Sequence, residues 1–174
     1  MRIKFFVSVL FALSLSGVAC GFQRDVTIRK YEIQNVIDPQ FPVEKDVIIA
    51  KAELKYPDVY FFKGDHLGMK LQYTGRFLKK PAEGQIDLHG SLIYRPEKGA
   101  LYLSKIEIVD FSVNKESRPN KDKLQGTFEA ILSDLMVTIP LYRLKQKDFK
   151  EDLAKLQLKK IRVENENLIL TVGR

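Results

Sequence analysis

The sequence contains no tryptophan, one cysteine and two histidines among its 174 residues. A single cysteine excludes an internal disulfide framework and any zinc site built from several cysteines. Long apolar runs are also missing beyond the first twenty residues, so no later segment approaches the roughly 18 apolar residues of a membrane-spanning helix. Hydrophobic residues make up 45% of the chain and charged residues 29%, which excludes disordered, collagen-like and coiled-coil classes. A chain of this length predicts one domain.

The N-terminus has the pattern of a secretory signal peptide. A positively charged start is followed by an apolar stretch from Phe5 to Leu15 and by small residues up to Cys20. This end resembles a bacterial lipobox, in which the cysteine is lipidated, although Gly17 stands where that pattern most often has leucine. We therefore predict a lipoprotein signal peptide over residues 1–19 and acylation of Cys20. The alternative is an ordinary signal peptide cleaved nearby, with Cys20 an unmodified thiol.

Lipidation of Cys20 predicts a membrane anchor. A diacylglycerol thioether and an amide-linked acyl chain such as palmitate place three chains on this residue, and two chains already give stable anchoring. Gly21 resembles an outer-membrane sorting signal, because an aspartate at that position retains such proteins in the inner membrane. We expect an outer-membrane lipid anchor facing the periplasm of a Gram-negative bacterium. Residues 20–25 are the predicted lipidated tether, and residues 26–174 form a single predicted domain.

The formal net charge of the whole chain is +7. We expect no nucleic-acid partner, because an exported lipoprotein rarely meets one. The positive excess fits attraction to anionic headgroups or to the cell wall. It also fits an ordinary solvated surface with scattered lysines.

Alternating apolar and polar residues predict strands from residue 50 to residue 113, each with one buried and one solvated face. Turn residues between them predict antiparallel neighbours, at Gly64–Asp65, Pro81–Gly84 and Pro96–Gly99. The alternation changes phase twice between Ala100 and Val113, which predicts β-bulges. Together with Gly75 and Gly90 inside strand patterns, these bulges predict a strongly curved sheet.

Helical patterns flank this region. Residues 30–37 predict a brief helix that Asp38-Pro39 ends. Apolar residues from Leu124 to Ile139 recur at i, i+4, i+7 and i+8, with Asn120 as a possible N-cap and Pro140 at the end. They predict a helix of roughly 18 residues in the concave face of the sheet. Glycine costs about 1 kcal/mol relative to alanine inside a helix, so we expect a close contact at Gly126.

Two further elements complete the chain. A weaker helical pattern covers residues 149–158. A final hairpin pairs Ile161 and Val163 with the apolar residues from Leu168 to Val172. The predicted fold class is therefore α+β, with a strongly curved antiparallel β-sheet wrapped around a long α-helix in the C-terminal half.

Catalytic chemistry is not indicated by these residues. His66 and His89 lie far apart in the sequence and lack nearby carboxylates, so they make a poor metal site. The chain has no Gly-x-Ser-x-Gly elbow and no glycine-rich phosphate loop followed by a helix. We expect no enzyme activity, no metal and no cofactor.

Several aliphatic strand motifs resemble the YceB-like family of Gram-negative lipoproteins, a domain of unknown function. The resemblance rests on Val26-Thr27-Ile28, Glu32-Ile33, Lys98 to Leu103 and Ile106 to Asp110. It covers nearly all of the chain after Cys20. That family is similar in fold to the tubular lipid-binding (TULIP) superfamily, in which a bent antiparallel sheet wraps a long helix and leaves an apolar groove for lipid tails. The resemblance implies this TULIP-like fold and a lipid ligand, and it carries over no catalytic residues.

Two functions follow from the sequence. In the first, the protein binds a phospholipid, a fatty acid or another apolar ligand in a groove between sheet and helix. The residues predicted to line this groove are Phe77, Phe111, Phe128, Leu132, Leu135 and Met136. In the second, the core is closed and the domain is a non-catalytic structural or protein-interaction module of the cell envelope. A helix stripe that lines a groove and one that fills a core have the same sequence pattern.

Overall fold

The structure is a computed structural model that describes residues 23–62, 64, 66–114, 120–145 and 157–173. Cys20 and most of the weak helical pattern at 149–158 lie outside these residues. The described elements follow in the order β1 (Gln23–Arg29), α1 (Lys30–Ile37), η1 (Asp38–Gln40), β2 (Val43–Val47), β3 (Ala50–Phe61), β4 (His66–Phe77), β5 (Lys80–Arg95), η2 (Pro96–Lys98), β6 (Ala100–Val113), α2 (Lys121–Met136), β7 (Tyr142–Arg143), β8 (Gln157–Glu164) and β9 (Asn167–Gly173).

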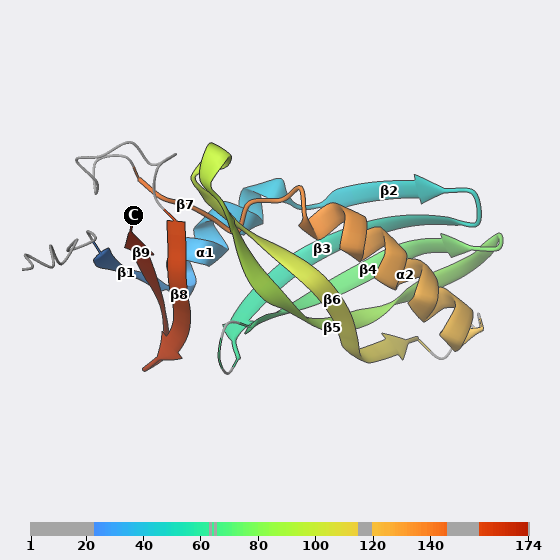
Figure 1. The fold of residues 1–174 in the computed structure, drawn as a ribbon. Helices are drawn as coiled ribbons and strands as arrows, with labels where there is room; N and C mark the ends of the chain where they lie inside the picture. Colours follow the sequence, from blue (N-terminus) through green and yellow to red (C-terminus); the bar gives the residue numbers. More distant parts are fainter. Residues whose placement is uncertain (1–22, 63, 65, 115–119, 146–156, 174) are drawn as a thin grey trace, which may run out of the picture.

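Most of the strands form a six-stranded antiparallel sheet in the order β2-β3-β4-β5-β6-β7 (Figure 1). Its middle strands alternate as the sequence predicts: Met69 and Leu71 of β4 are buried, whereas Lys70 and Gln72 are exposed. The predicted bulges in β6 are confirmed, because its pairing with β5 shifts register in two places. One shift lies beside Lys105, whose backbone φ is +50°.

The turn predicted at Pro81–Gly84 is wrong. These residues lie inside β5, and the chain reverses earlier, at Leu78–Lys79. Gly84 is needed for a close approach between strands, since a Cβ there would lie 2.0 Å from the carbonyl oxygen of Ser112 in β6. A glycine in a strand marks such a contact as readily as it marks a turn.

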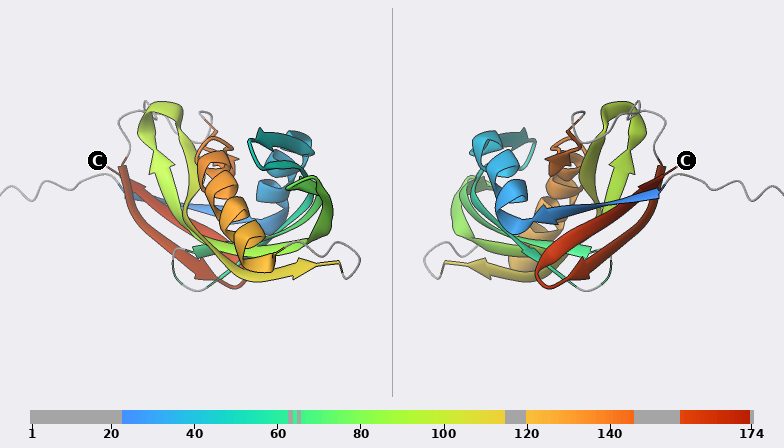
Figure 2. Two further views of the ribbon diagram at one scale, coloured as in Figure 1. Left: turned by 90° about the vertical axis from the view of Figure 1, so that its right-hand side faces the viewer. Right: turned by 90° about the vertical axis from the view of Figure 1, so that its left-hand side faces the viewer.

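The predicted helix in the C-terminal half is present as α2, which has 16 residues and lies on one face of the six-stranded sheet (Figure 2). The side chain of Asn120 accepts a hydrogen bond from the backbone N–H of Lys123 at 3.0 Å, as expected of an N-cap. The apolar stripe faces the sheet, and its buried members are Leu124, Phe128, Ile131, Leu132, Leu135 and Met136.

The fold-class prediction of a sheet wrapped around a long helix is wrong. Most described residues are in strands, and the two α-helices have only 8 and 16 residues. The chain does not finish on a helix but continues from α2 into β7, β8 and β9. The interior is filled by several short elements, because α1 also buries Ile33 and Ile37 and β9 buries Leu168 and Leu170. A single helix is therefore not what the sheet encloses.

A separate three-stranded sheet joins the two ends of the described chain, in the order β1-β9-β8. The predicted C-terminal hairpin is confirmed as β8 and β9, but Leu158 belongs to β8 and not to a helix. β1 pairs with β9 over its whole length, from Gln23 opposite Gly173 to Arg29 opposite Asn167. Residues 23–25, predicted as part of the tether, are therefore in a strand.

Within the described residues, none of the helices combines the length and the apolar character needed to cross a bilayer.

Candidate functional site

The six residues predicted to line an apolar groove lie on α2 and on the six-stranded sheet against which α2 packs. Phe77 ends β4, Phe111 belongs to β6 and the other four lie on α2. All six belong to one hydrophobic core, and none has more than 5% of its surface exposed. We call this contact the α2–sheet interface. The interface is closed to solvent, and a ligand-binding role for these six residues stays a prediction.

An aromatic cluster fixes α2 against the sheet. The Phe111 and Phe128 rings have centroids 5.8 Å apart, and Tyr73 of β4 lies beside both, at 5.4 Å and 4.5 Å. The Tyr73 hydroxyl donates a hydrogen bond to the backbone oxygen of Ser112 at 3.0 Å. Burial, with a smaller contribution from Glu83, raises the pKa of Tyr73 to about 12, so the phenol stays protonated and keeps this donor. The alternation in β4 already placed Tyr73 on the buried face.

Apolar contact is what holds α2 to the sheet. Among the described residues, the side-chain hydrogen bonds of α2 stay within the helix and its cap, as in the bond from the Thr127 hydroxyl to the Lys123 carbonyl at 2.9 Å. The close contact expected at Gly126 is absent, because a Cβ built there meets nothing within 4 Å. Apolar contacts lack the directional requirements of hydrogen bonds. An acyl chain could therefore replace the helix face without leaving a polar group unpaired.

Two cavities lie elsewhere, beside α1. One, of about 600 Å³, lies between α1 and β3, and the other, of about 570 Å³, lies between α1 and the β8–β9 turn. Gln34 of α1 lines both. Its side-chain amide donates to the Pro57 carbonyl at 2.5 Å, and its side-chain oxygen accepts from the Val59 N–H at 3.1 Å. Both bonds reach β3 at or beside its register shift, which lies between Lys55 and Asp58. Gln34 therefore has a structural role, because it holds α1 against this bulge.

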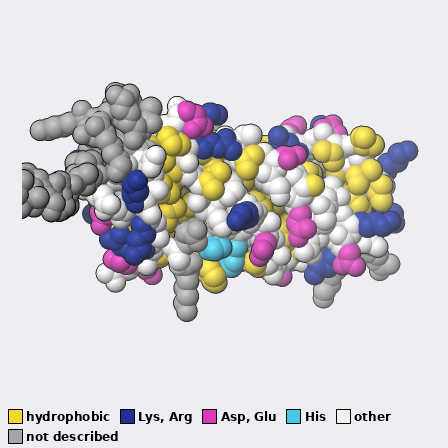
Figure 3. Space-filling view, viewed as in Figure 1, with side chains coloured by type: hydrophobic (Ala, Val, Ile, Leu, Met, Phe, Trp, Pro, Cys, Tyr) yellow, Lys and Arg dark blue, Asp and Glu magenta, His cyan; other side chains and the backbone are white. Residues whose placement is uncertain are grey.

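The two histidines lie on the polar surface of the six-stranded sheet and form no metal site with the described residues (Figure 3). The Tyr60 hydroxyl donates to Asp87 at 2.5 Å and lies 2.7 Å from Nε2 of His89. Burial and the Asp87 carboxylate together raise the pKa of Tyr60, so it remains a neutral donor. His66 has its own contact, 3.4 Å from the Ser91 hydroxyl. No group of three or more metal-ligating side chains occurs in the described part of the chain.

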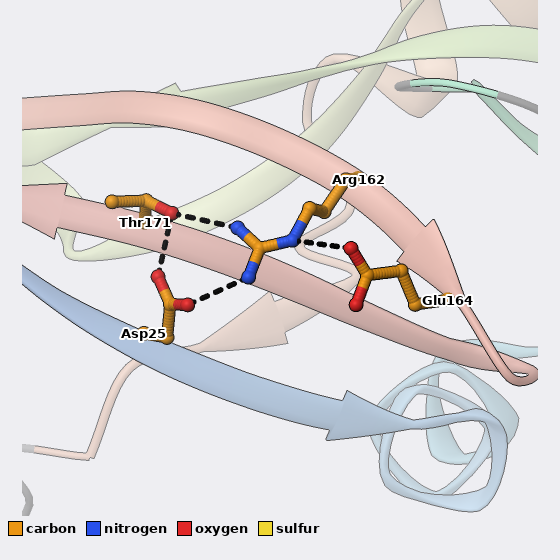
Figure 4. Close-up of polar contacts among 4 residues, drawn as sticks. All are labelled: Asp25, Arg162, Glu164 and Thr171. Atoms are coloured by element: carbon orange, nitrogen blue, oxygen red, sulfur yellow. Dashed lines mark hydrogen bonds and ion pairs between the residues drawn. The ribbon is translucent and has the colours of Figure 1, made fainter.

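A polar cluster on the three-stranded sheet ties the two ends of the chain together (Figure 4). The Arg162 guanidinium of β8 donates to Asp25 of β1 and to Glu164, both at 2.7 Å, and to the Thr171 hydroxyl at 3.1 Å. The Thr171 hydroxyl also donates to Asp25 at 2.6 Å. The bonds from Thr171 and then Arg162 lower the pKa of the Asp25 carboxyl. Every member of this cluster has a partner, which favours a structural role over catalysis.

The family follows from comparison with known proteins. Residues 31–167 match the family described as "Protein of unknown function (DUF1439)". The chain belongs to this family. The matched segment runs from α1 to the first residue of β9, so it includes the whole six-stranded sheet and α2.

A curated relative matches over almost the whole chain. The chain is 24% identical over 189 residues to "Uncharacterized lipoprotein YceB" of Salmonella typhimurium strain LT2, and the alignment covers 96% of this chain and 97% of the relative. The YceB-like resemblance predicted from the strand motifs is thereby confirmed. Among solved structures, the crystal structure of a lipopolysaccharide binding protein covers 85% of this chain and 40% of its own, with 13% identity. Its TM-score of 0.30 is too low to support an argument about this protein.

Proposed function

We propose that this protein is a lipid-anchored protein of the bacterial envelope that binds one acyl chain of a phospholipid or fatty acid between α2 and the six-stranded sheet. The observation that carries the proposal is the attachment of α2 through apolar side chains, with its described side-chain hydrogen bonds kept inside the helix. A helix held in this way can separate from the sheet and leave an apolar surface that fits an acyl chain.

Apolar burial at the closed α2–sheet interface and burial of a bound acyl chain contribute free energies of similar size. Burial of one large apolar side chain contributes about 1.5–3 kcal/mol, so the six on α2 contribute roughly 9–18 kcal/mol. An acyl chain of about 14 methylenes contributes about 11 kcal/mol at 0.8 kcal/mol for each CH₂. Much of that gain is cancelled when the chain leaves a bilayer, where it is already buried. If the bound chain covers the apolar faces of both α2 and the sheet, the burial of the α2 side chains is kept, and the net preference for the protein over the bilayer is small. A small preference suits exchange of a lipid better than its storage.

Acylation of Cys20 provides the proposed anchor. The support is the lipobox-like pattern before Cys20 and the full-length likeness to a protein named as a lipoprotein. Gly21 favours the outer membrane, with the domain facing the periplasm. Cys20→Ser should leave an unacylated protein that fractionates with soluble proteins. If that variant still floats with membranes, the anchor proposal is wrong.

The closed α2–sheet interface favours a second candidate function. With every predicted groove residue buried, the domain can also act as a structural or interaction module whose core never opens. In that case α2 stays in place and no lipid is taken up.

Native mass spectrometry separates the two functions. The chain lacking residues 1–20 is suitable, because it retains every described core residue, from Ile28 to Val172. Purified without detergent, the protein should carry phospholipid or fatty acid, or take up added palmitate. A mass that stays free of lipid under both conditions would support the closed module.

A pair of neighbouring substitutions on α2 locates the site. Leu132→Ala removes a buried side chain from the α2–sheet interface and should change the amount of palmitate bound. Ser133→Ala alters the adjacent exposed position and should leave binding unchanged. Equal effects of the two substitutions would place the ligand outside this interface. Circular dichroism checks folding, since Leu→Ala in a core costs about 2–5 kcal/mol.

A further inference from the structure

Four large apolar side chains are exposed where two hairpin turns meet at one end of the molecule. We call this end the hairpin tip and define it as residues 44–51, 76 and 78–80. Ile48 is fully exposed, Leu78 is 54% exposed, and Val47 and Ile49 are exposed by 39% and 44%. In Figure 3 this apolar patch occupies the end of the molecule that carries the β2–β3 and β4–β5 turns in Figure 1. Soluble proteins rarely cluster such side chains in water without a binding partner.

The two turns form one unit with an unusual backbone. The Leu78 N–H donates to the Ile49 carbonyl at 2.9 Å, so the β2–β3 and β4–β5 turns are bonded to each other. Leu78 and Lys79 have φ values of +49° and +67°, a left-handed conformation in which two-residue hairpin turns favour glycine and asparagine. A strained conformation at residues that expose an apolar and a cationic side chain favours a role for those side chains.

Positive charge surrounds the apolar side chains. The hairpin tip contains two acidic residues, Glu44 and Asp46, and five basic ones: Lys45, Lys51, Arg76, Lys79 and Lys80. Lys51 forms a long ion pair with Glu44, at 3.9 Å. Between the turns lies a hollow of about 390 Å³ that Ile48, Leu78 and Lys79 help to line. The tip therefore combines protruding apolar side chains with a net excess of three positive charges.

We propose that the hairpin tip inserts into the headgroup region of a bilayer that contains anionic phospholipids. The exposed apolar side chains reach the boundary between headgroups and acyl chains, and the surrounding lysines and arginine pair with phosphate groups. This geometry favours a bilayer over a folded protein partner. A bilayer surface accommodates a protruding tip and supplies negative charge around it, whereas a protein would need a matching acidic pocket.

The hairpin tip is separate from the proposed lipid anchor at Cys20 and from the α2–sheet interface. It lies at the end of the six-stranded sheet, while β1, which begins three residues after Cys20, lies at the opposite end of the molecule (Figure 1). None of the tip side chains is among the six at the α2–sheet interface. Membrane binding by the tip can therefore be tested on a chain without Cys20, and its failure would leave the lipid-uptake proposal untouched.

The absence of tryptophan from the sequence allows a direct test. Ile48→Trp in the chain lacking residues 1–20 gives a single reporter at the tip. Val109→Trp is the matched control, because Val109 is a 51% exposed apolar residue in the second half of β6. Added vesicles of phosphatidylcholine mixed equally with phosphatidylglycerol should blue-shift the emission of the Ile48→Trp variant alone. Vesicles of phosphatidylcholine alone should cause a much smaller shift.

Binding measured by vesicle flotation gives the magnitudes. Each basic residue near an anionic surface strengthens binding about fivefold, so three net charges give roughly a hundredfold preference for the anionic vesicles at low salt. Replacing Ile48 and Leu78 together by serine should weaken binding about tenfold or more without lowering the melting temperature, because both side chains are exposed. Equal shifts of the two tryptophan reporters, equal affinity for the two vesicle types, or absence of binding would each overturn the proposal.

Discussion

Gly75 and Gly126 both interrupt regular elements, but their surroundings differ. A Cβ on Gly75, in β4, would lie 2.0 Å from the backbone oxygen of Lys51 and 2.8 Å from the Cα of Ala52 in the neighbouring strand. A Cβ on Gly126, in α2, would meet nothing within 4 Å. The first glycine is therefore required by a close approach between strands, and the second is not required by packing.

Gly126→Ala should stabilise the protein by about 0.5–1 kcal/mol, because alanine loses less backbone entropy in a helix and finds free space here. Urea unfolding measures this as a higher midpoint with an unchanged m-value. A lower midpoint would mean that the surroundings of Gly126 are more crowded than the structure shows.

Gly75→Ala should act in the opposite direction. The added methyl group has to displace the backbone of β3, and overpacking of this kind costs about 1–3 kcal/mol. The same urea experiment should show a lower midpoint, with Gly126→Ala as the matched control for the substitution itself. Unchanged stability would contradict the tight pairing of β3 and β4 at this position.

Asp25 gives a residue-scale prediction for pH. The hydrogen bond from Thr171 and the contact with Arg162 lower the pKa of Asp25 from its ordinary value of 3.8. A carboxyl whose pKa is lower in the folded state stabilises the fold above its unfolded pKa, and this contribution is lost as the pH falls through the folded pKa.

Asp25→Asn should therefore lower the melting temperature at neutral pH. The difference from the unmodified protein should shrink as the pH falls from about 3.8 through the lower pKa of the folded state, where the folded carboxyl becomes protonated. Asp46→Asn, at an exposed position of the hairpin tip, is the control for the Asp→Asn substitution itself. A difference that stays constant down to low pH would mean that Asp25 does not stabilise the fold through its charge.

At the scale of elements, local patterns predicted the helices and the C-terminal hairpin well. The i, i+4, i+7 stripe with Asn120 in front locates α2, and Asp38-Pro39 marks the end of α1. Each of these patterns lies within a short stretch of sequence, so it can be recognised without knowing the rest of the fold. The burial of the side chains at the α2–sheet interface can be predicted for the same reason, because the stripe on α2 and the alternation in β4 and β6 identify the buried faces.

Turns without their usual residues could not be located from the sequence. The β4–β5 turn consists of Leu78 and Lys79 in left-handed conformations, and the β2–β3 turn consists of Ile48 and Ile49. Neither turn contains glycine, asparagine or proline, whereas Pro81–Gly84 has the residues typical of a turn and lies in a strand. Without the positions of the turns, the sequence analysis does not predict the exposed apolar side chains of the hairpin tip. The run Val47-Ile48-Ile49 beside several lysines is the sequence feature that indicates them.

Lys79→Gly should stabilise the fold by about 1 kcal/mol, since glycine adopts a left-handed φ without the cost that lysine has. It should also weaken binding to anionic vesicles, because one tip charge is lost. Lys80→Gly removes the same charge from β5 without relieving the turn, so it should weaken vesicle binding to a similar extent and lower the urea midpoint. If the two variants change stability alike, the strain assigned to the Leu78–Lys79 turn is wrong.

At the scale of the whole molecule, the sequence does not predict the pairing of β1 with β9. The partners are far apart in the chain, and an alternating pattern identifies a strand without naming its neighbour. The incorrect fold class has the same cause, because the sequence does not show which strands pair. The sequence shows a curved sheet and an apolar helix, but not that β1, β8 and β9 form a second sheet or that α1 and β9 help to fill the interior.

Two regions of the molecule are assigned separate contacts with lipid. The α2–sheet interface is proposed to take up an acyl chain, whereas the hairpin tip is proposed to contact the headgroups of an anionic bilayer. Because these regions share no side chains, labelling experiments can tell them apart.

The most direct test of acyl-chain uptake is photolabelling with a diazirine-bearing fatty acid, followed by mapping of the labelled peptides. We predict label on peptides that contain Phe111 and residues 128–136, with competition by unlabelled palmitate. Label confined to the peptides of the hairpin tip, or the lack of any label that palmitate displaces, would contradict a lipid site between α2 and the sheet.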